Sequence, residues 1–300
     1  MPATVDIGAA YRRAECDREA GDERTSPMTS AFFPERAEAH PYVFADSGSE
    51  ERDRLRLLAR LLDPLHQRTL RAAGIRAGMR CLELGSGAGT MAAWMADQVG
   101  ADGHVMATDI DLSILKDLRR PNLTVRELDV ITDEMPRGAF DVITCRALLH
   151  HLPQREAVVK RLAGALEPNG ALVLIEPDAG AAVFGDPEQQ RFWSAWCRWG
   201  EAEGIDFQLG RKLPRTVQRA GLDLRDVTME VPFYGGDSSW GELYRSTVRA
   251  ARPRLDGWVD PELMAGFEHS GTRSAHPMCS FGWVAVRGRA AHEAKAVRSR

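Results

Sequence analysis

The pattern of apolar and polar positions divides the chain into short buried strands that alternate with helices. Apolar runs predict strands at residues 79–84, 104–108, 123–128, 139–145 and 171–176. Helical spacing of apolar residues follows at 90–100, 111–120 and 155–166, and glycine or proline marks several of the ends. Strands that are apolar on both faces are typical of a parallel sheet covered by helices on both sides. The order therefore predicts a doubly wound α/β fold.

Further elements flank these five units. The segment from Ser49 has leucines at helical spacing and predicts a helix pair, bent or broken at Pro64. After the fifth strand come helical segments rich in aromatic residues, then a helix, a glycine cap and a strand at 212–231, a mixed helical stretch at 236–268 and a closing strand at 280–288. We therefore expect a Rossmann-like sheet of seven strands, with a helical N-terminal arm and helical insertions after strand 5 and before strand 7.

We expect residues 1–48 to form the N-terminal arm, partly mobile, residues 49–287 the main domain, and residues 288–300 a basic tail. No stretch approaches the roughly 20 apolar residues of a membrane span, and the first thirty residues lack the apolar core of a secretory signal. These features predict a cytoplasmic protein. The net charge of −4 and the interleaved acids and bases argue against nucleic acid as a substrate.

An acidic glycine loop, Glu83-Leu84-Gly85-Ser86-Gly87-Ala88-Gly89, follows the first strand and precedes a helix. Glycines let the main chain approach a ligand, and the following helix offers unpaired N–H groups. A dinucleotide loop has its third glycine at the position of Thr90, so the spacing points away from a nicotinamide cofactor. Glu83 adds a negative charge that favours a cationic cofactor.

Two aspartates follow the next two strands. Asp109 lies twenty residues beyond Gly89, where a carboxylate can accept both ribose hydroxyls. Asp129 follows the third strand and could accept the adenine amino group, with Ile110 and Val130 beside the ring. Each aspartate alone is equally explained as a loop or cap residue.

Five segments together resemble the consecutive signature segments of class I S-adenosylmethionine-dependent methyltransferases. They are CLELGSGAGT, VMATDID, ELDV, FDVITCRALLHHLP and LEPNGALVLIEPD, and they resemble the group that includes UbiE-like and many bacterial natural-product enzymes. The resemblance is close over roughly residues 75–180. It implies a seventh strand that is antiparallel, and S-adenosylmethionine as the cofactor, which becomes S-adenosylhomocysteine.

The same resemblance implies which residues hold the cofactor. Glu83, the loop glycines, Asp109 and Asp129 would bind it, Cys145 and Arg146 would pass close to it, and Tyr42 would cover it. We expect transfer of a methyl group to oxygen, nitrogen or carbon of a small molecule, such as a secondary metabolite. Two alternatives stay open: a methyltransferase-like protein that catalyses a non-methylating reaction, and a nicotinamide-dependent oxidoreductase.

The candidate for acid–base chemistry is His150, the first residue of a histidine pair after the fourth strand. The pair is equally explained as a structural cap of the loop. Glu176 and Asp178 border the same cleft after the fifth strand, and the tryptophans at 193, 196 and 199 either line a pocket or form core. We expect no metal, because Asp178 alone would not hold a hard cation. A homodimer is possible, and the sequence does not identify the acceptor.

Overall fold

The computed structural model describes residues 48–270, 278–279 and 281–291, all in one compact unit of the chain. The strands are β1 (Arg80–Leu84), β2 (His104–Asp109), β3 (Leu123–Glu127), β4 (Phe140–Arg146), β5 (Leu166–Asp178), β6 (Asp223–Glu230), β7 (Phe233–Tyr234), β8 (Met278–Cys279) and β9 (Gly282–Arg289). The α-helices are α2 (Gly48–Ala73), α3 (Thr90–Val99), α4 (Arg155–Ala165), α5 (Pro187–Ala202), α6 (Leu213–Arg219), α7 (Ser239–Ala251) and α8 (Pro261–Ser270). Short 3-10 helices are η2 (Leu149–His151), η3 (Ala179–Phe184), η4 (Gly210–Lys212) and η5 (Arg252–Arg254).

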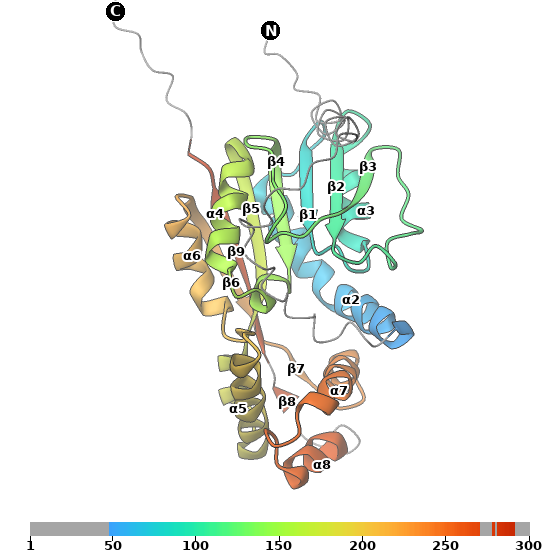
Figure 1. The fold of residues 1–300 in the computed structure, drawn as a ribbon, viewed down its shortest axis with the longest axis vertical. Helices are drawn as coiled ribbons and strands as arrows, with labels where there is room; N and C mark the ends of the chain where they lie inside the picture. Colours follow the sequence, from blue (N-terminus) through green and yellow to red (C-terminus); the bar gives the residue numbers. More distant parts are fainter. Residues whose placement is uncertain (1–47, 271–277, 280, 292–300) are drawn as a thin grey trace, which may run out of the picture. The chain divides into compact units, whose positions relative to one another are not determined.

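Seven strands form the main sheet in the order β3-β2-β1-β4-β5-β9-β6 (Figure 1). The first five strands are parallel, and β9 runs antiparallel to both β5 and β6. Helices α2 and α3 pack their apolar residues on one face, where Leu70, Met91 and Val142 share a core. Helices α4 and α6 contact each other and lie across the sheet from α3 (Figure 1). The prediction of a seven-stranded, mostly parallel sheet covered on both faces is confirmed.

The helical insertions form a second core below the sheet in Figure 1. Helices α5, α7 and α8 gather there with the two-stranded sheet of β7 and β8, which the sequence did not predict. Trp193, Trp196 and Trp199 are almost completely buried and pack edge-on against one another in sequence order. Phe192 stacks on Phe267, which joins α5 to α8. The three tryptophans therefore form core, and Trp193 also lines a groove beside α5.

Two local predictions are wrong. The segment from Ser49 is one continuous helix rather than a pair, and Pro64 lies on its exposed side while the opposite side packs on the sheet and α7. Residues 111–120 form turns rather than a helix. Leu115 and Leu118 each close a four-residue turn, and both pack against Gly89, so tertiary contact fixes the path of this segment.

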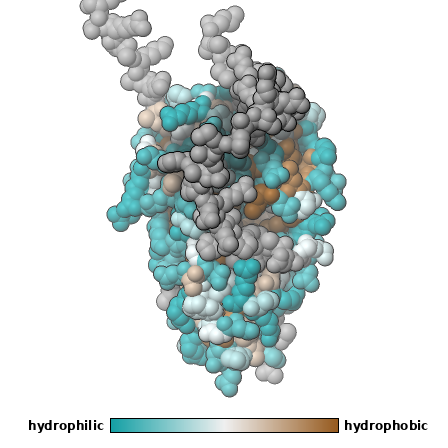
Figure 2. Space-filling view, in the orientation of Figure 1, coloured by the Kyte–Doolittle hydropathy of each residue, from teal (hydrophilic) through white to brown (hydrophobic). Residues whose placement is uncertain are grey.

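Hydrophilic residues predominate among the coloured residues of Figure 2, including those of the helical part below the sheet. No helix in the part of the chain that the structure describes is long and apolar enough to cross a membrane.

The continuous path of α2 through Pro64 yields a stability prediction. Proline has no N–H to donate to the carbonyl of Arg60, so Pro64→Ala restores one helical hydrogen bond on an exposed surface. We expect the free energy of unfolding to rise by about 1 kcal/mol in urea titrations. The matched control is Pro187→Ala at the first turn of α5, where proline fits the helix and its removal brings no gain. Lower stability of Pro64→Ala would contradict the argument.

Candidate active site

The glycine loop connects β1 to α3 in a backbone conformation that suits glycine. Gly85, Gly87 and Gly89 have φ angles of 62°, 49° and 71°, in the left-handed region. A Cβ atom at Gly89 would lie 2.9 Å from the side chain of Leu115. The Ser86 N–H donates to the carbonyl of Thr108 at 2.9 Å, which ties the loop to β2. The loop is thus held tightly at the amino end of α3.

Asp109 ends β2 and reaches the glycine loop. Its Oδ2 accepts a hydrogen bond from the Gly87 N–H at 2.9 Å, and its Oδ1 accepts one from the Asp111 N–H at 3.3 Å. Burial raises the pKa of Asp109, and these backbone N–H groups act in the opposite direction. A carboxylate has about four acceptor positions, so Asp109 can still accept hydroxyl groups of a ligand.

Glu83 lies buried in β1 directly before the loop. Its Oε2 has no hydrogen-bond partner among the residues that the structure describes. Burial raises the pKa of Glu83 to about 8, even though Arg146 acts to lower it. A buried acceptor without a partner needs compensation, and a cationic ammonium or sulfonium group would supply it. The residues present therefore fit a cationic cofactor such as S-adenosylmethionine.

Helix α2 closes this side of the site. Arg146 at the end of β4 forms an ion pair with Asp63 of α2 at 2.8 Å, and both side chains are mostly buried. A Cβ atom at Gly87 would lie 3.8 Å from Leu55 of α2, so the helix also borders the glycine loop. Arg146 thus connects α2 to the strand end beside Glu83.

The other cofactor candidates lie around the same strand ends. Asp129 follows β3, and its two carboxylate oxygens accept from the Ile131 N–H and the Thr132 hydroxyl at 2.8 and 2.9 Å. Ile110 is 60% exposed beside Asp109, and Val130 is buried. Cys145 is fully buried, and burial raises the pKa of its thiol well above the usual range. Tyr42 lies outside the described residues. Whether these residues bind the cofactor stays a prediction.

His150 lies in η2 and contacts Glu176 at the end of β5. The His150 Nδ1 is 2.7 Å from Glu176 Oε2. The Oε1 of Glu176 accepts the N–H groups of Leu148 and Leu149 at 3.1 and 2.8 Å, and Oε2 accepts that of His150 at 3.3 Å. The carboxylate therefore fixes both the turn and the imidazole ring. The sequence placed Glu176 at the cleft but gave no sign of this pairing, which joins residues 26 apart.

Asp178, the other acidic candidate, is bound differently. Its carboxylate accepts from the Arg211 backbone N–H at 2.7 Å and from the Arg211 guanidinium, with the shortest contact at 2.6 Å. Both of its oxygens are engaged in that contact. Asp178 therefore anchors the segment before α6. No cluster of metal-binding side chains occurs within residues 48–270, 278–279 and 281–291.

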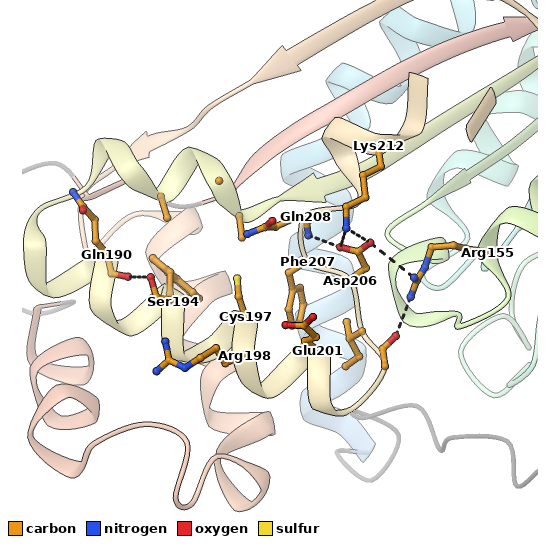
Figure 3. A pocket seen from close by; sticks show the side chains of 16 residues that line it. Arg155, Gln190, Ser194, Cys197, Arg198, Glu201, Asp206, Phe207, Gln208 and Lys212 are labelled. Atoms are coloured by element: carbon orange, nitrogen blue, oxygen red, sulfur yellow. Dashed lines mark hydrogen bonds and ion pairs between the residues drawn. The ribbon is translucent and has the colours of Figure 1, made fainter. Parts of the chain in front are cut away.

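A groove of about 720 Å³ lies outside the strand ends, between one face of α5 and the segment at 204–208 (Figure 3). Polar and charged side chains line it, among them Arg155, Arg198 and Lys212. In Figure 3, Asp206 lies between Lys212 and Arg155, with ion pairs to both.

The arrangement of sheet, glycine loop and acidic strand ends agrees with a comparison against known families. Residues 51–227 match the model of a family described as "Methyltransferase domain". The chain belongs to this methyltransferase family. The class I S-adenosylmethionine-dependent group expected from the sequence is confirmed, and so is its cofactor. The nicotinamide alternative is set aside.

Individual relatives of this methyltransferase are distant. Uncharacterized methyltransferase Mb0092 of Mycobacterium bovis is 33% identical over 116 residues, which are 37% of this chain and 57% of that protein. A ubiquinone biosynthesis O-methyltransferase of Xanthomonas euvesicatoria is 29% identical over 161 residues, 51% of this chain and 66% of that protein. The match thus spans little more than half the length of the first relative.

Two solved structures share the fold. A phosphoethanolamine N-methyltransferase of Haemonchus contortus, in complex with S-adenosylhomocysteine, has a TM-score of 0.54 at 14% identity, and the match covers 83% of this chain and 59% of that one. The [4+2]-cyclase SpnF has a TM-score of 0.50 at 18% identity, and the match covers 78% of this chain and 80% of the SpnF chain.

Because Glu83 is buried, replacing it by glutamine should raise the stability of the fold but weaken cofactor binding. The folded protein holds a proton on Glu83 up to a pKa of about 8, whereas the unfolded chain releases it near pH 4.5. Stability therefore falls as the pH rises between these values. At pH 7.5 we expect Glu83→Gln to raise the free energy of unfolding by on the order of 2–4 kcal/mol. The same variant should bind S-adenosylmethionine at least about tenfold more weakly, since a charged hydrogen bond is lost.

Denaturant titrations at pH 5 and pH 7.5, with calorimetry of cofactor binding, measure both effects. The matched control is Glu156→Gln, which removes only an exposed ion pair to Arg219 and should change either quantity little. Unchanged cofactor affinity in Glu83→Gln would show that Glu83 does not face the cofactor.

Proposed function

We propose that this protein transfers a methyl group from S-adenosylmethionine to a hydroxyl oxygen of a small molecule. The observation that carries the proposal is the 2.7 Å contact between His150 Nδ1 and Glu176 Oε2. S-adenosylmethionine, when bound, supplies a methyl group already activated by its sulfonium. The protein then has to align the acceptor and remove the hydroxyl proton.

The His150–Glu176 pair has the protonation state that a base requires. Burial lowers the pKa of His150 to about 3, so the ring is neutral at neutral pH. Burial raises the pKa of Glu176 to about 7, and three backbone N–H groups act to lower it. Above that pH, the carboxylate accepts the Nδ1 proton of the neutral ring. Nε2 of that tautomer then carries a lone pair and no proton, as the proposed role requires.

Apolar side chains beside the same strand ends support an apolar or aromatic acceptor. Trp283 packs with Ile175 near the end of β5, and Trp240 and Ala147 are only partly buried against them. The indole N–H of Trp283 is buried without a partner among the described residues, so it could donate a hydrogen bond to an oxygen of the acceptor. A relative whose name states O-methyltransferase activity also favours oxygen.

Several expectations belong to the same proposal. We infer a cytoplasmic enzyme of secondary metabolism that acts on neither nucleic acid nor membrane, and a homodimer stays a prediction. The net charge of −4 supports a small-molecule acceptor, since acids and bases are interleaved along the chain outside the basic tail at 288–300.

Replacing His150 tests the proposal. In His150→Gln we expect turnover to fall about 100-fold or more, because proton removal is lost, while S-adenosylmethionine affinity measured by calorimetry is kept. Phenols of increasing acidity should progressively restore the rate, since they ionise without a base. The control is His104→Gln, at the amino end of β2, which should leave turnover unchanged. An unaltered rate in His150→Gln would show that His150 has only a structural role.

Glu176→Gln provides a second measurement. The amide oxygen can still accept the backbone N–H groups of Leu148 and Leu149, but the negative charge that stabilises the Nδ1 proton is lost. We expect turnover to fall while cofactor affinity is retained. Loss of cofactor binding in both variants would contradict the separation of the two roles.

A further inference from the structure

Arg155, the first residue of α4, joins the turn that carries His150 to the segment at 204–208. Its Nε donates to the carbonyl of Leu149 at 3.3 Å, and Nη2 donates to the carbonyl of Gly204 at 2.9 Å. Its Nη1 lies 3.8 Å from Asp206 Oδ2. One planar guanidinium therefore spans two backbone segments and one carboxylate, a geometry that lysine does not reproduce.

The segment that Arg155 holds contacts His150 at two places. The Asp206 N–H donates to the His150 carbonyl at 2.8 Å. The Phe207 ring centroid lies 5.7 Å from that of the His150 ring. Lys212 Nζ binds both carboxylate oxygens of Asp206 at 2.9 and 2.7 Å, so Asp206 is held from two sides (Figure 3). A displacement of Arg155 would thus be transmitted to both the backbone and the ring of His150.

We propose that Arg155 is a positioning residue of this methyltransferase, which holds the turn η2 and keeps the His150–Glu176 pair in its proton-accepting state. The inference rests on the proposed function of that pair and deepens it. Arg155 lies in α4, and no motif in the sequence indicates this role.

Charges around the pair support this role. The groups that face His150 are Glu176 from β5, His151 from η2, Arg54 from α2, Arg155 from α4 and Asp206 from the connecting segment. After burial, Arg155 is the largest influence that lowers the pKa of His150, and Asp206 raises it. Arg155 also lowers the pKa of Glu176. A positive charge at this position therefore disfavours a proton on either member.

The charge of Arg155 should extend activity to lower pH. A proton added to the pair leaves Nε2 unable to accept another. The pair is then either imidazolium with carboxylate, or a neutral ring whose Nδ1 accepts from the carboxylic acid and whose hydrogen is on Nε2. Without the charge of Arg155 this proton binds at higher pH. Activity on the acidic side is then lost at higher pH than in the wild type.

Three variants separate charge from geometry. In Arg155→Leu we expect the acidic limb of the kcat/KM profile to move up by about half to one pH unit, and kcat to fall about tenfold or more through misplacement of His150. Arg155→Lys should keep the limb near its wild-type position while kcat still falls. Asp206→Asn keeps the backbone N–H to His150 and should move the limb downward. In all three the KM for S-adenosylmethionine should change little.

Arg219→Leu is the matched control, since Arg219 forms an exposed ion pair with Glu156 of the same helix α4. Its profile should coincide with that of the wild type. Circular dichroism and melting temperature check that each variant is folded. If Arg155→Leu does not fold, the opposite shift in Asp206→Asn and the loss of kcat in Arg155→Lys still decide the proposal.

A second readout does not need turnover. Nitrogen-15 NMR titration of the histidines, with S-adenosylhomocysteine bound and the His150 signals assigned through His150→Gln, reports the protonation midpoint of the pair. We expect that midpoint to rise in Arg155→Leu and to stay near its wild-type value in Arg155→Lys. An unchanged limb and midpoint in Arg155→Leu would overturn the proposal. If the wild type methylates no acceptor, or if His150→Gln keeps full turnover, the proposed function fails while the NMR titration still decides the role of Arg155.

Discussion

Two glutamates are buried at the carboxyl ends of parallel strands, and the site depends on how the charge of each is compensated. Glu176 receives three backbone N–H groups and the His150 ring from its own chain. Glu83 has an oxygen without any partner in the described part of the chain. Burial of an unpaired carboxylate is unfavourable by several kcal/mol. The two acids therefore differ, since the described residues satisfy Glu176 but leave one oxygen of Glu83 without a partner, as expected for a residue that faces a ligand.

The order of the sheet explains why these requirements meet in one place. The strand order reverses between β1 and β4, and ligands of open parallel sheets bind outside the strand ends at such a point. Glu83 and Asp109 lie on the β1–β2 side of β4, and Glu176 lies on the β5 side. Ala147 follows β4 with a φ of 52°, and its N–H bonds to the carbonyl of Ile175. The end of β4 thus separates the side with the glycine loop from the side with His150.

Much of the fold could be predicted from the sequence because burial on both faces leaves a strong apolar pattern. The glycine spacing and the acids at strand ends are local signals, and they led to the predictions of the loop and of Asp109, whereas the prediction of His150 came from the histidine pair after the fourth strand. Contacts between distant residues leave no such signal. The bond between Arg155 and Gly204 joins positions 49 apart and depends on the path of α5. Tertiary packing likewise overrode two local patterns. Helix α2 continues through Pro64 although proline predicted a break, and the segment after Asp111 forms turns although its spacing predicted a helix.

Phe207 connects the core of the helical insertions to His150. Its ring packs against Trp196, Trp199 and Phe281 in the core of the helical insertions, and it also contacts His150. A closely packed core responds to a change in side-chain volume by shifting its neighbours. Changes in the volume of side chains in the insertions are therefore expected to displace the Phe207 ring and the His150 ring beside it. Arg155 and Asp206 oppose that displacement, because they tie the same segment to the backbone of η2. The insertions can thus vary only within the limits that this connection allows.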